Sequence, residues 1–318
     1  VLGSTFGTMN AAYANAVNQN ATVTTTYGDA DVVTLTATAA TVTLGAAADE
    51  LTSFVTTATQ ATALGITAGT LTVDGTITTA STGPLTITLS GTGNLTMSGA
   101  TVENHATNAA MTLALGGNTF TTTGAVTHAT KISGVGAVVI SGDTTFSDTI
   151  GAGTAITSIT TAATKTTTFS EVVTATGAAT TTLDGAITFA KNATAGSFSI
   201  GTGGSMSVLS ANANTITGAI DGDATGKGTL TINNTNAAEP IFASDIGGSN
   251  SLLLITGTTG ATFNGNVSAT SLTLANSKEI DLAKDLTVTT ATLTGTASKL
   301  IFDGAVDQTI TGTIVGAA

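Results

Sequence analysis

Few residues of this 318-residue sequence could do acid–base or nucleophilic chemistry. It contains two histidines, His105 and His128, and neither cysteine nor arginine. The lack of cysteine excludes disulfides, thiolate metal sites and cysteine nucleophiles. No Gly-x-Ser-x-Gly motif stands in a strand–turn–helix context. We interpret Glu103-Asn104-His105 as a polar loop and His128 as a strand-edge residue, so the sequence predicts neither an enzyme nor a resident cofactor.

One acidic loop, Asp221 to Gly228, offers oxygen ligands to a metal ion. It is not a P-loop, because its glycine spacing is wrong and Gly228 stands where Ser or Thr would bind magnesium. Asp221 and Asp223 place two carboxylates close together in the sequence, and calcium prefers clustered oxygens. A complete calcium loop needs another acidic ligand, which is missing nearby. The pair therefore has two interpretations, a calcium site or a solvated turn.

The charge balance limits the classes of partner. The net charge is −12, and all 7 basic residues are lysines. A negative chain without arginine repels phosphate backbones and has no bidentate fork for phosphate, which excludes nucleic acid and anionic membrane surfaces. The longest apolar stretches, such as Leu252 to Ile255, fall far short of the roughly 18 residues of a membrane-spanning segment. Only 8% of residues are charged, against about 25% on average, which is typical of exported bacterial surface proteins and predicts an extracellular location.

The elements that would position any site are β-strands over most of the chain. From residue 66 to residue 318, short runs alternate aliphatic residues with threonine, and clusters of Gly, Asn, Asp and Ser separate them. Such period-2 alternation puts the aliphatic residues on one face of a strand and threonine on the other. Examples of these runs are 71–73, 85–89, 95–97, 111–115, 230–232, 271–274, 286–288 and 310–314. The fold class is therefore all-β.

Residues 1–65 differ in texture and form a predicted mixed N-terminal region that couples or anchors the rest. Residues 9–17 place apolar side chains at helical spacing. Residues 49–64 are a second helix candidate, with Asp49 and Glu50 at the start and Gly65 just past the end. The many threonines of this segment oppose a helix, because β-branching lowers helix propensity. Two strands are predicted between the candidates, at 31–36 and 41–44.

A degenerate repeat runs through the β region: an apolar residue, Asp or Asn, Gly, any residue, then Ile or Val. Its glycines stand at 75, 185, 265 and 304, with looser copies at 124 and 218, and no single period fits them. Such a glycine belongs either to a tight hairpin turn with positive φ or to the corner of a β-solenoid. We favour an elongated β-solenoid, a right-handed β-helix, because successive runs have the similar length and composition that stacked rungs require. The alternative is a set of tandem antiparallel β-sandwich domains.

Segments such as 69–79 and 260–276 resemble the passenger repeats of Gram-negative autotransporter and haemagglutinin-like surface proteins. The surface-layer-forming outer membrane antigens of rickettsiae are the most similar in texture. The resemblance covers roughly residues 66–318 and implies a right-handed β-helix displayed outside the cell as a coat or an adhesin.

Three functions follow as hypotheses. The favoured one is a non-enzymatic, self-assembling extracellular structural protein, a surface-layer or filament subunit whose partners are copies of itself and the cell envelope or a glycan. Low charge and repetition support such lateral packing. The second is an adhesin or receptor-binding passenger or fibre. The third is a polysaccharide-active β-helix enzyme, which the absence of arginine disfavours.

Overall fold

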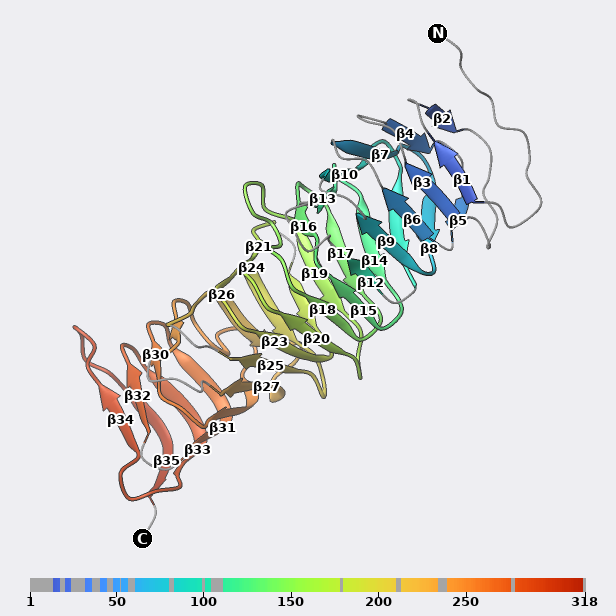
Figure 1. Cartoon of the computed structure of the whole chain (residues 1–318). Coiled ribbons are helices and arrows are strands. Elements are labelled where there is room, and N and C mark those ends of the chain that lie inside the picture. Colours follow the sequence, from blue (N-terminus) through green and yellow to red (C-terminus); the bar gives the residue numbers. More distant parts are fainter. Residues whose placement is uncertain are drawn as a thin grey trace. The chain divides into compact units, whose positions relative to one another are not determined.

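The computed structural model places the strands β1 to β35 and contains no helix among the residues it describes (Figure 1). These residues are 14–17, 21–23, 32–35, 41–44, 48–51, 53–56, 61–79, 83–98, 101–103, 111–177, 180–209, 213–233, 239–275 and 278–316. The chain divides into two compact units, Val1–Thr157 and Ser158–Ala318, which are described in turn.

The first unit is built from three parallel sheets, which the chain visits in a fixed order before it begins the next rung. Sheet A contains, in spatial order, β1 (Ala14–Val17), β3 (Val32–Leu35), β6 (Ser53–Thr56), β9 (Thr76–Thr79), β12 (Thr101–Glu103), β15 (Val126–His128) and β18 (Thr144–Phe146). Sheet B contains β2 (Ala21–Val23), β4 (Thr41–Leu44), β7 (Thr62–Ile66), β10 (Leu85–Leu89), β13 (Met111–Ala114) and β16 (Lys131–Ser133). Sheet C contains β5 (Ala48–Leu51), β8 (Thr70–Val73), β11 (Asn94–Met97), β14 (Thr119–Thr122) and β17 (Ala137–Ile140).

The second unit has two parallel sheets, because several of its strands are long enough to cover two sides of a rung. Sheet D contains β20 (Thr166–Phe169), β23 (Ala186–Phe189), β25 (Ser205–Val208), β27 (Lys227–Ile232), β29 (Leu252–Gly257), β31 (Val267–Leu274), β33 (Leu286–Leu293) and β35 (Ile310–Gly316). Sheet E contains β19 (Ser158–Thr161), β22 (Thr181–Leu183), β24 (Ala193–Ile200), β26 (Thr215–Gly222), β28 (Ile241–Phe242), β30 (Ala261–Phe263), β32 (Glu279–Leu282) and β34 (Lys299–Phe302). The remaining strand, β21 (Val173–Ala175), pairs with the first half of β24, and β22 pairs with its second half.

Each strand pairs in parallel with the strand one rung away, as Ile187 pairs with Met206 and Leu272 with Ala291. Both units are therefore β-solenoids. The solenoid prediction is confirmed, and the alternative of antiparallel sandwiches is wrong. A sandwich would require antiparallel neighbours, whereas the pairings of the described strands are parallel.

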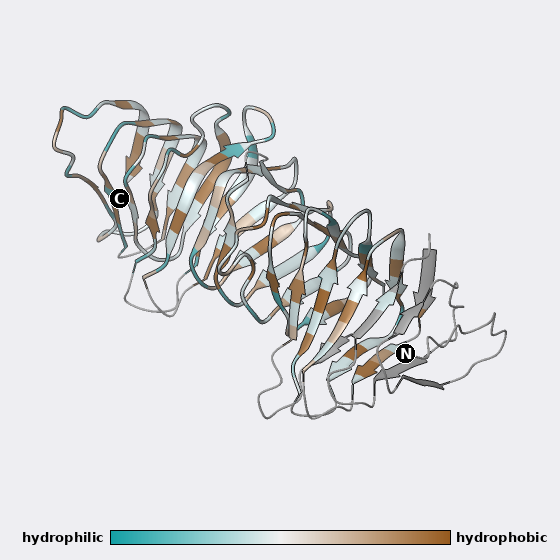
Figure 2. Cartoon of the chain, turned by 90° about the horizontal axis from the view of Figure 1, so that it is seen from above, coloured by the Kyte–Doolittle hydropathy of each residue, from teal (hydrophilic) through white to brown (hydrophobic). Residues whose placement is uncertain are grey.

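The core follows the alternation of the sequence. In β10, Leu85, Ile87 and Leu89 are buried and the two threonines between them are exposed. Figure 2 shows the same alternation of brown hydrophobic and pale residues along many strands. Outward threonines also stand in register between rungs, as Thr86 does with Thr112. Their β-branched side chains suit this pleated, half-exposed surface.

The Asp/Asn-Gly element lies at corners between consecutive strands: Gly185 joins β22 to β23, Gly265 joins β30 to β31, and Gly304 follows β34. None of these three glycines has positive φ. A Cβ added at any of them would lie under 3.0 Å from backbone atoms of the preceding rung. For these three copies the solenoid-corner interpretation is confirmed and the hairpin interpretation is wrong, because the glycine is needed for close approach of two rungs. The looser copy at Gly218 is not a corner, since it lies inside β26 with a φ of 120°.

The irregular spacing of the repeat has a simple cause. A rung takes 26 residues from Val102 to His128 but only 17 from Ile255 to Leu272, although both pairs are in register. Corner loops of different length account for the difference. The sheets keep their register because it is set strand by strand and not by the number of residues in a corner.

The predicted helix at 49–64 is wrong. This segment contains β5, β6 and the start of β7, and Phe54 of β6 is fully buried opposite Ile77. Parallel pairing satisfies the backbone on both sides of β6 and β7 and on one side of β5, and this pairing overrides the acidic and glycine capping signals. In the other helix candidate, residues 9–13 lie outside the described residues and 14–17 form β1. The predicted strands at 31–36 and 41–44 are present as β3 and β4.

Residue 65, the predicted end of the N-terminal region, lies within β7. The strands before and after it belong to the same sheets, since β6 pairs with β9 and β7 pairs with β10. Within the described part of the chain, no helix is long and apolar enough to cross a membrane.

Candidate functional site

Asp221 and Asp223 do not converge on a common point. One carboxylate oxygen of Asp221 accepts hydrogen bonds from the backbone N–H groups of Ser249 at 2.9 Å and Asn250 at 3.4 Å. Asp223 instead accepts from the backbone N–H of Thr202 at 3.2 Å and from its hydroxyl at 3.4 Å. Asp221 therefore bonds to a segment later in the chain, and Asp223 bonds to a segment earlier in the chain. No group of three or more potential metal-ligating His, Cys, Asp or Glu residues occurs in the described ranges. Calcium binding at this pair stays a prediction.

Asp221 belongs to a set of residues whose side-chain oxygens accept hydrogen bonds from backbone N–H groups of the next rung. Asp245 accepts from the N–H of Asn266 at 2.7 Å, and Asp285 accepts from the N–H of Thr309 at 2.8 Å. The other members are Asn94, which accepts from Thr119, and Asn192, which accepts from Thr215, both at 2.9 Å. We call Asn94, Asn192, Asp221, Asp245 and Asp285 the rung clamps. The sequence shows these residues next to strands but not the N–H groups that they bind.

The Asp245 clamp gives a direct test of this role. Asp245→Ala is expected to destabilise the second unit by about 0.5–1.5 kcal/mol, because a hydrogen bond between rungs is lost at an exposed position where water can take its place. Asp245→Asn should cost less, since an amide oxygen still accepts. Denaturant unfolding followed by far-ultraviolet circular dichroism measures both, with the exposed Asp307→Ala as the control. Equal stabilities for the two Asp245 variants and the control would show that the clamp contributes nothing.

Of the two histidines, only His128 lies among the described residues. His105 lies outside the described residues. His128 is the last residue of β15, but its side chain is only 1% exposed and lies between the rings of Phe120 and Phe146. The interpretation of His128 as a strand-edge residue is therefore wrong for its side chain, which belongs to the core. It contacts no carboxylate and no hydroxyl nucleophile through its Nε2 atom, which has no hydrogen-bond partner.

Among the described residues, a group of exposed apolar side chains lies on the rung formed by β34 and β35. On β35, Ile310 and Ile314 are 43% and 44% exposed, whereas their register partners on β33, Leu286 and Ala291, are fully buried. On β34, Leu300 and Phe302 are half-buried, and their partners on β32 are fully buried. These four inward-facing residues, Leu300, Phe302, Ile310 and Ile314, form what we call the open face.

The strand edge beside the open face is unprotected. β35 is the last strand of sheet D, so one of its edges has unpaired N–H and C=O groups. Its sequence, Ile310 to Gly316, contains no charge and no proline, the residues that normally block an edge from pairing. Nearby, Lys299 of β34 forms an exposed ion pair with Glu279 of β32, with 3.3 Å between the charged atoms. The arrangement has the two features that strand addition requires, an unpaired strand edge and apolar side chains beside it.

Comparisons with protein-family models, with curated proteins and with solved structures found no match. The candidate site is therefore defined by geometry alone: an open face with an unpaired parallel edge, on a wall of hydroxyl-bearing strands.

Proposed function

We propose that this chain is a non-enzymatic structural protein that self-assembles outside the cell, as a subunit of a surface layer or an extracellular filament. The observation that carries the proposal is the stacking itself, because each strand pairs in parallel and in register with the strand one rung away. The four residues of the open face are half-buried or exposed, whereas their register partners one rung earlier are fully buried. A further rung, from more of the same polypeptide or from a second copy, would cover these side chains and pair with β35.

The energetics favour such an addition. Burial of apolar surface contributes about 25 cal/mol for each Å² removed from water. Pairing along β35 would also satisfy the backbone groups of its free edge, as in recognition by strand addition. Within the solenoid each rung contacts only its neighbours, so an added copy meets the same environment as an internal rung.

The composition supports the extracellular setting. A chain without cysteine, with 8% charged residues and with threonine over its outward strand faces is typical of exported surface proteins. The resemblance to autotransporter and rickettsial surface-antigen repeats points in the same direction. We include the cell envelope or a glycan among the partners, because the outward threonine and serine hydroxyls suit polar contacts and glycan attachment.

Assembly can be tested with one inward and one outward substitution on the same strand. Ile314→Asp puts a charge on the open face and should convert assemblies to single particles, because an unpaired charge is costly to bury. Thr313→Asp puts the same charge on the exposed outer side of β35 and should leave assembly largely intact. Sedimentation velocity measures the size of the particles, and negative-stain electron microscopy shows whether they are ordered sheets or filaments.

Two results would contradict the proposal. If the unaltered chain sediments as a monomer at all concentrations, self-assembly is wrong; tight binding of that monomer to a glycan or to host cells would then favour the adhesin hypothesis. If both aspartate variants assemble like the unaltered chain, assembly does not use the open face. Turnover of a polysaccharide would support the enzyme hypothesis instead.

A further inference from the structure

His128 occupies a position in sheet A that apolar residues hold in the rungs around it. Its register partners are Val102 on β12 and Phe146 on β18, and Val102 in turn pairs with Ile77 on β9. The imidazole stacks on Phe146, with 5.1 Å between ring centroids, and meets Phe120 edge-on at 5.0 Å. An ionisable ring thus stands where the fold requires an apolar side chain.

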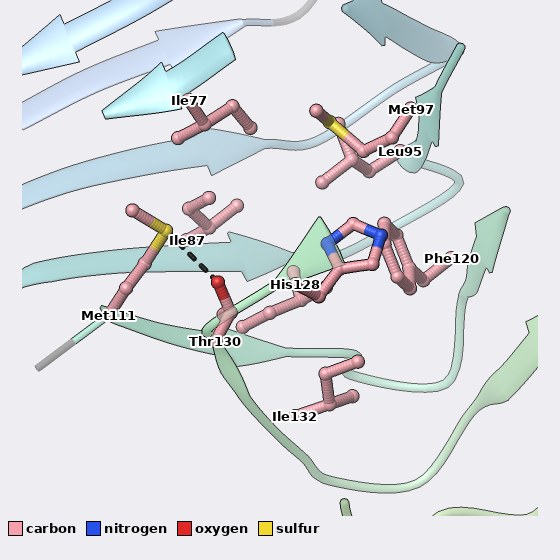
Figure 3. A pocket seen from close by; sticks show the side chains of 10 residues that line it. Ile77, Ile87, Leu95, Met97, Met111, Phe120, His128, Thr130 and Ile132 are labelled. Atoms are coloured by element: carbon pink, nitrogen blue, oxygen red, sulfur yellow. Dashed lines mark hydrogen bonds between the residues drawn. The ribbon is translucent and has the colours of Figure 1, made fainter. Parts of the chain in front are cut away.

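The surroundings of the ring contain almost nothing to solvate a charge. A small internal cavity lies beside it, and the described side chains that line it are otherwise apolar except for one threonine (Figure 3). These residues are Ile77, Ile87, Leu95, Met97, Met111, Leu113, Phe120, His128, Thr130 and Ile132. The hydroxyl of Thr130 is already bonded to the sulfur of Met111 at 3.2 Å. The cavity leaves about 10 Å³ for the centre of a water molecule, the lower limit for holding one.

Among the side chains that the structure describes, none with a charge lines the cavity beside His128. Lys131 on β16 is half-buried, Asp143 ahead of β18 is exposed, and neither lines the cavity. Nε2 has no hydrogen-bond partner. Burial without a compensating charge lowers the pKa of His128 from 6.5 to about 3. The imidazole is therefore neutral in the folded chain at neutral pH.

We propose that the rung carrying His128 is an acid-triggered opening point of the first unit, at which protonation of the imidazole drives β15 away from its neighbours. The proton is the ligand, and the cavity-lined rung is the element that it opens. Since the described side chains around the ring include no carboxylate that could take up the charge, the protonated ring is stable only where water reaches it. The rest of the described core has no other histidine, so the response is confined to this rung.

The sign and size of the effect follow from linkage. The pKa of His128 is lowered in the folded state, so above pH 6.5 the imidazole is neutral in both the closed and the open rung and does not destabilise the closed one. As the pH falls from 6.5 toward 3, the closed rung loses stability, because the open state binds a proton that the closed state excludes. Between pH 7 and pH 5 the opening equilibrium of this rung should rise by about 25-fold.

Hydrogen exchange of the full chain, followed by mass spectrometry and corrected for intrinsic rates, measures this opening. Peptides that cover β15 and β18 should show the rise, and peptides from the second unit should not. In His128→Phe and His128→Leu the rise should fall below about 2-fold, because the position is apolar. The double variant Thr127→His/His128→Phe, which moves the imidazole to the exposed neighbouring position, should behave like His128→Phe.

Two outcomes would overturn the proposal. One is an equal rise with pH in the unaltered chain and in both His128 variants. The other is titration of His128 near pH 6.5 in the folded chain. Because His105 and His128 are the only histidines, carbon-13 histidine labelling gives two signals in nuclear magnetic resonance spectra. The signal that disappears in His128→Phe belongs to His128, and its titration can then be followed directly. Neither result depends on whether the chain assembles.

Discussion

Replacement of Phe189 by alanine is expected to destabilise the second unit by about 3–5 kcal/mol, the usual cost of removing a large buried side chain. Phe189 is 1% exposed and lies between two other rings. It stacks on Phe169 of the preceding rung at 5.1 Å and meets Phe198 of β24 edge-on at 5.9 Å. Aromatic residues are only 4% of the chain, so the small aliphatic neighbours cannot fill the space.

Two comparisons separate this effect from a general loss of apolar residues. Phe189→Leu keeps part of the volume and should cost clearly less than Phe189→Ala. Leu253→Ala removes a side chain that is 49% exposed and should change stability by no more than about 0.5 kcal/mol. Guanidinium unfolding measures the loss, and hydrogen exchange should show it first in β20, β23 and β24, since a rung transmits stress to its neighbours. A loss below 1 kcal/mol for Phe189→Ala would mean that the ring stack contributes little.

Substitution of Gly185 by alanine is expected to cost about 1–3 kcal/mol, as overpacking does elsewhere. The added Cβ would meet the backbone carbonyl oxygens of Ala162 and Lys165 at less than 3.0 Å. The chain cannot simply move aside, because the N–H of Ala186 donates to that same Lys165 carbonyl at 2.7 Å. The strain therefore acts on the contact between two rungs.

Two further variants show which property of Gly185 matters. Asn often replaces glycine where positive φ is required, so a turn of that kind would tolerate Gly185→Asn. Close approach of the backbone forbids any Cβ, and we expect Gly185→Asn to be at least as damaging as Gly185→Ala. Gly316→Ala is the control, because an added Cβ there meets nothing within 4 Å. Thermal unfolding of the three variants decides the matter, and an unchanged transition for both Gly185 variants would show that the corner relaxes freely.

The local alternation of the sequence predicted the strands well. Runs such as Leu85 to Leu89 bury every second residue, and no other arrangement hides their aliphatic side chains while exposing threonine. The prediction of a helix at 49–64 failed for a reason that the same argument explains. Asp49, Glu50 and Gly65 resemble capping residues, but Phe54 is buried only because strands on both sides pair with β6. Such pairing depends on residues more than 20 positions away.

The candidate site was harder to predict for the same physical reason. The sequence offered Asp221 as a possible calcium ligand, which stays a prediction, and did not reveal it as a hydrogen-bond acceptor. The N–H groups that it accepts from belong to Ser249 and Asn250 on the next rung and cannot be found without the register. His128 was misplaced because the residues that enclose it, Phe120 and Phe146, come from other strands at unequal separations. The open face could not be predicted from local sequence, because Ile310 has the same alternating pattern around it as a buried residue. Its exposure is visible only when the order of all the rungs is known.

The unequal rung lengths have a consequence for how this chain can change. Register is held by strand pairing and by the rung clamps, so a corner can gain or lose residues without shifting the wall beside it, as the 17-residue and 26-residue rungs already demonstrate. The corner segments can therefore change length and sequence in evolution independently of one another. For the same reason they are suitable sites for inserting foreign peptides. The stacked strands fix the distance between successive corners, so peptides grafted into corners of successive rungs would be presented at a regular spacing.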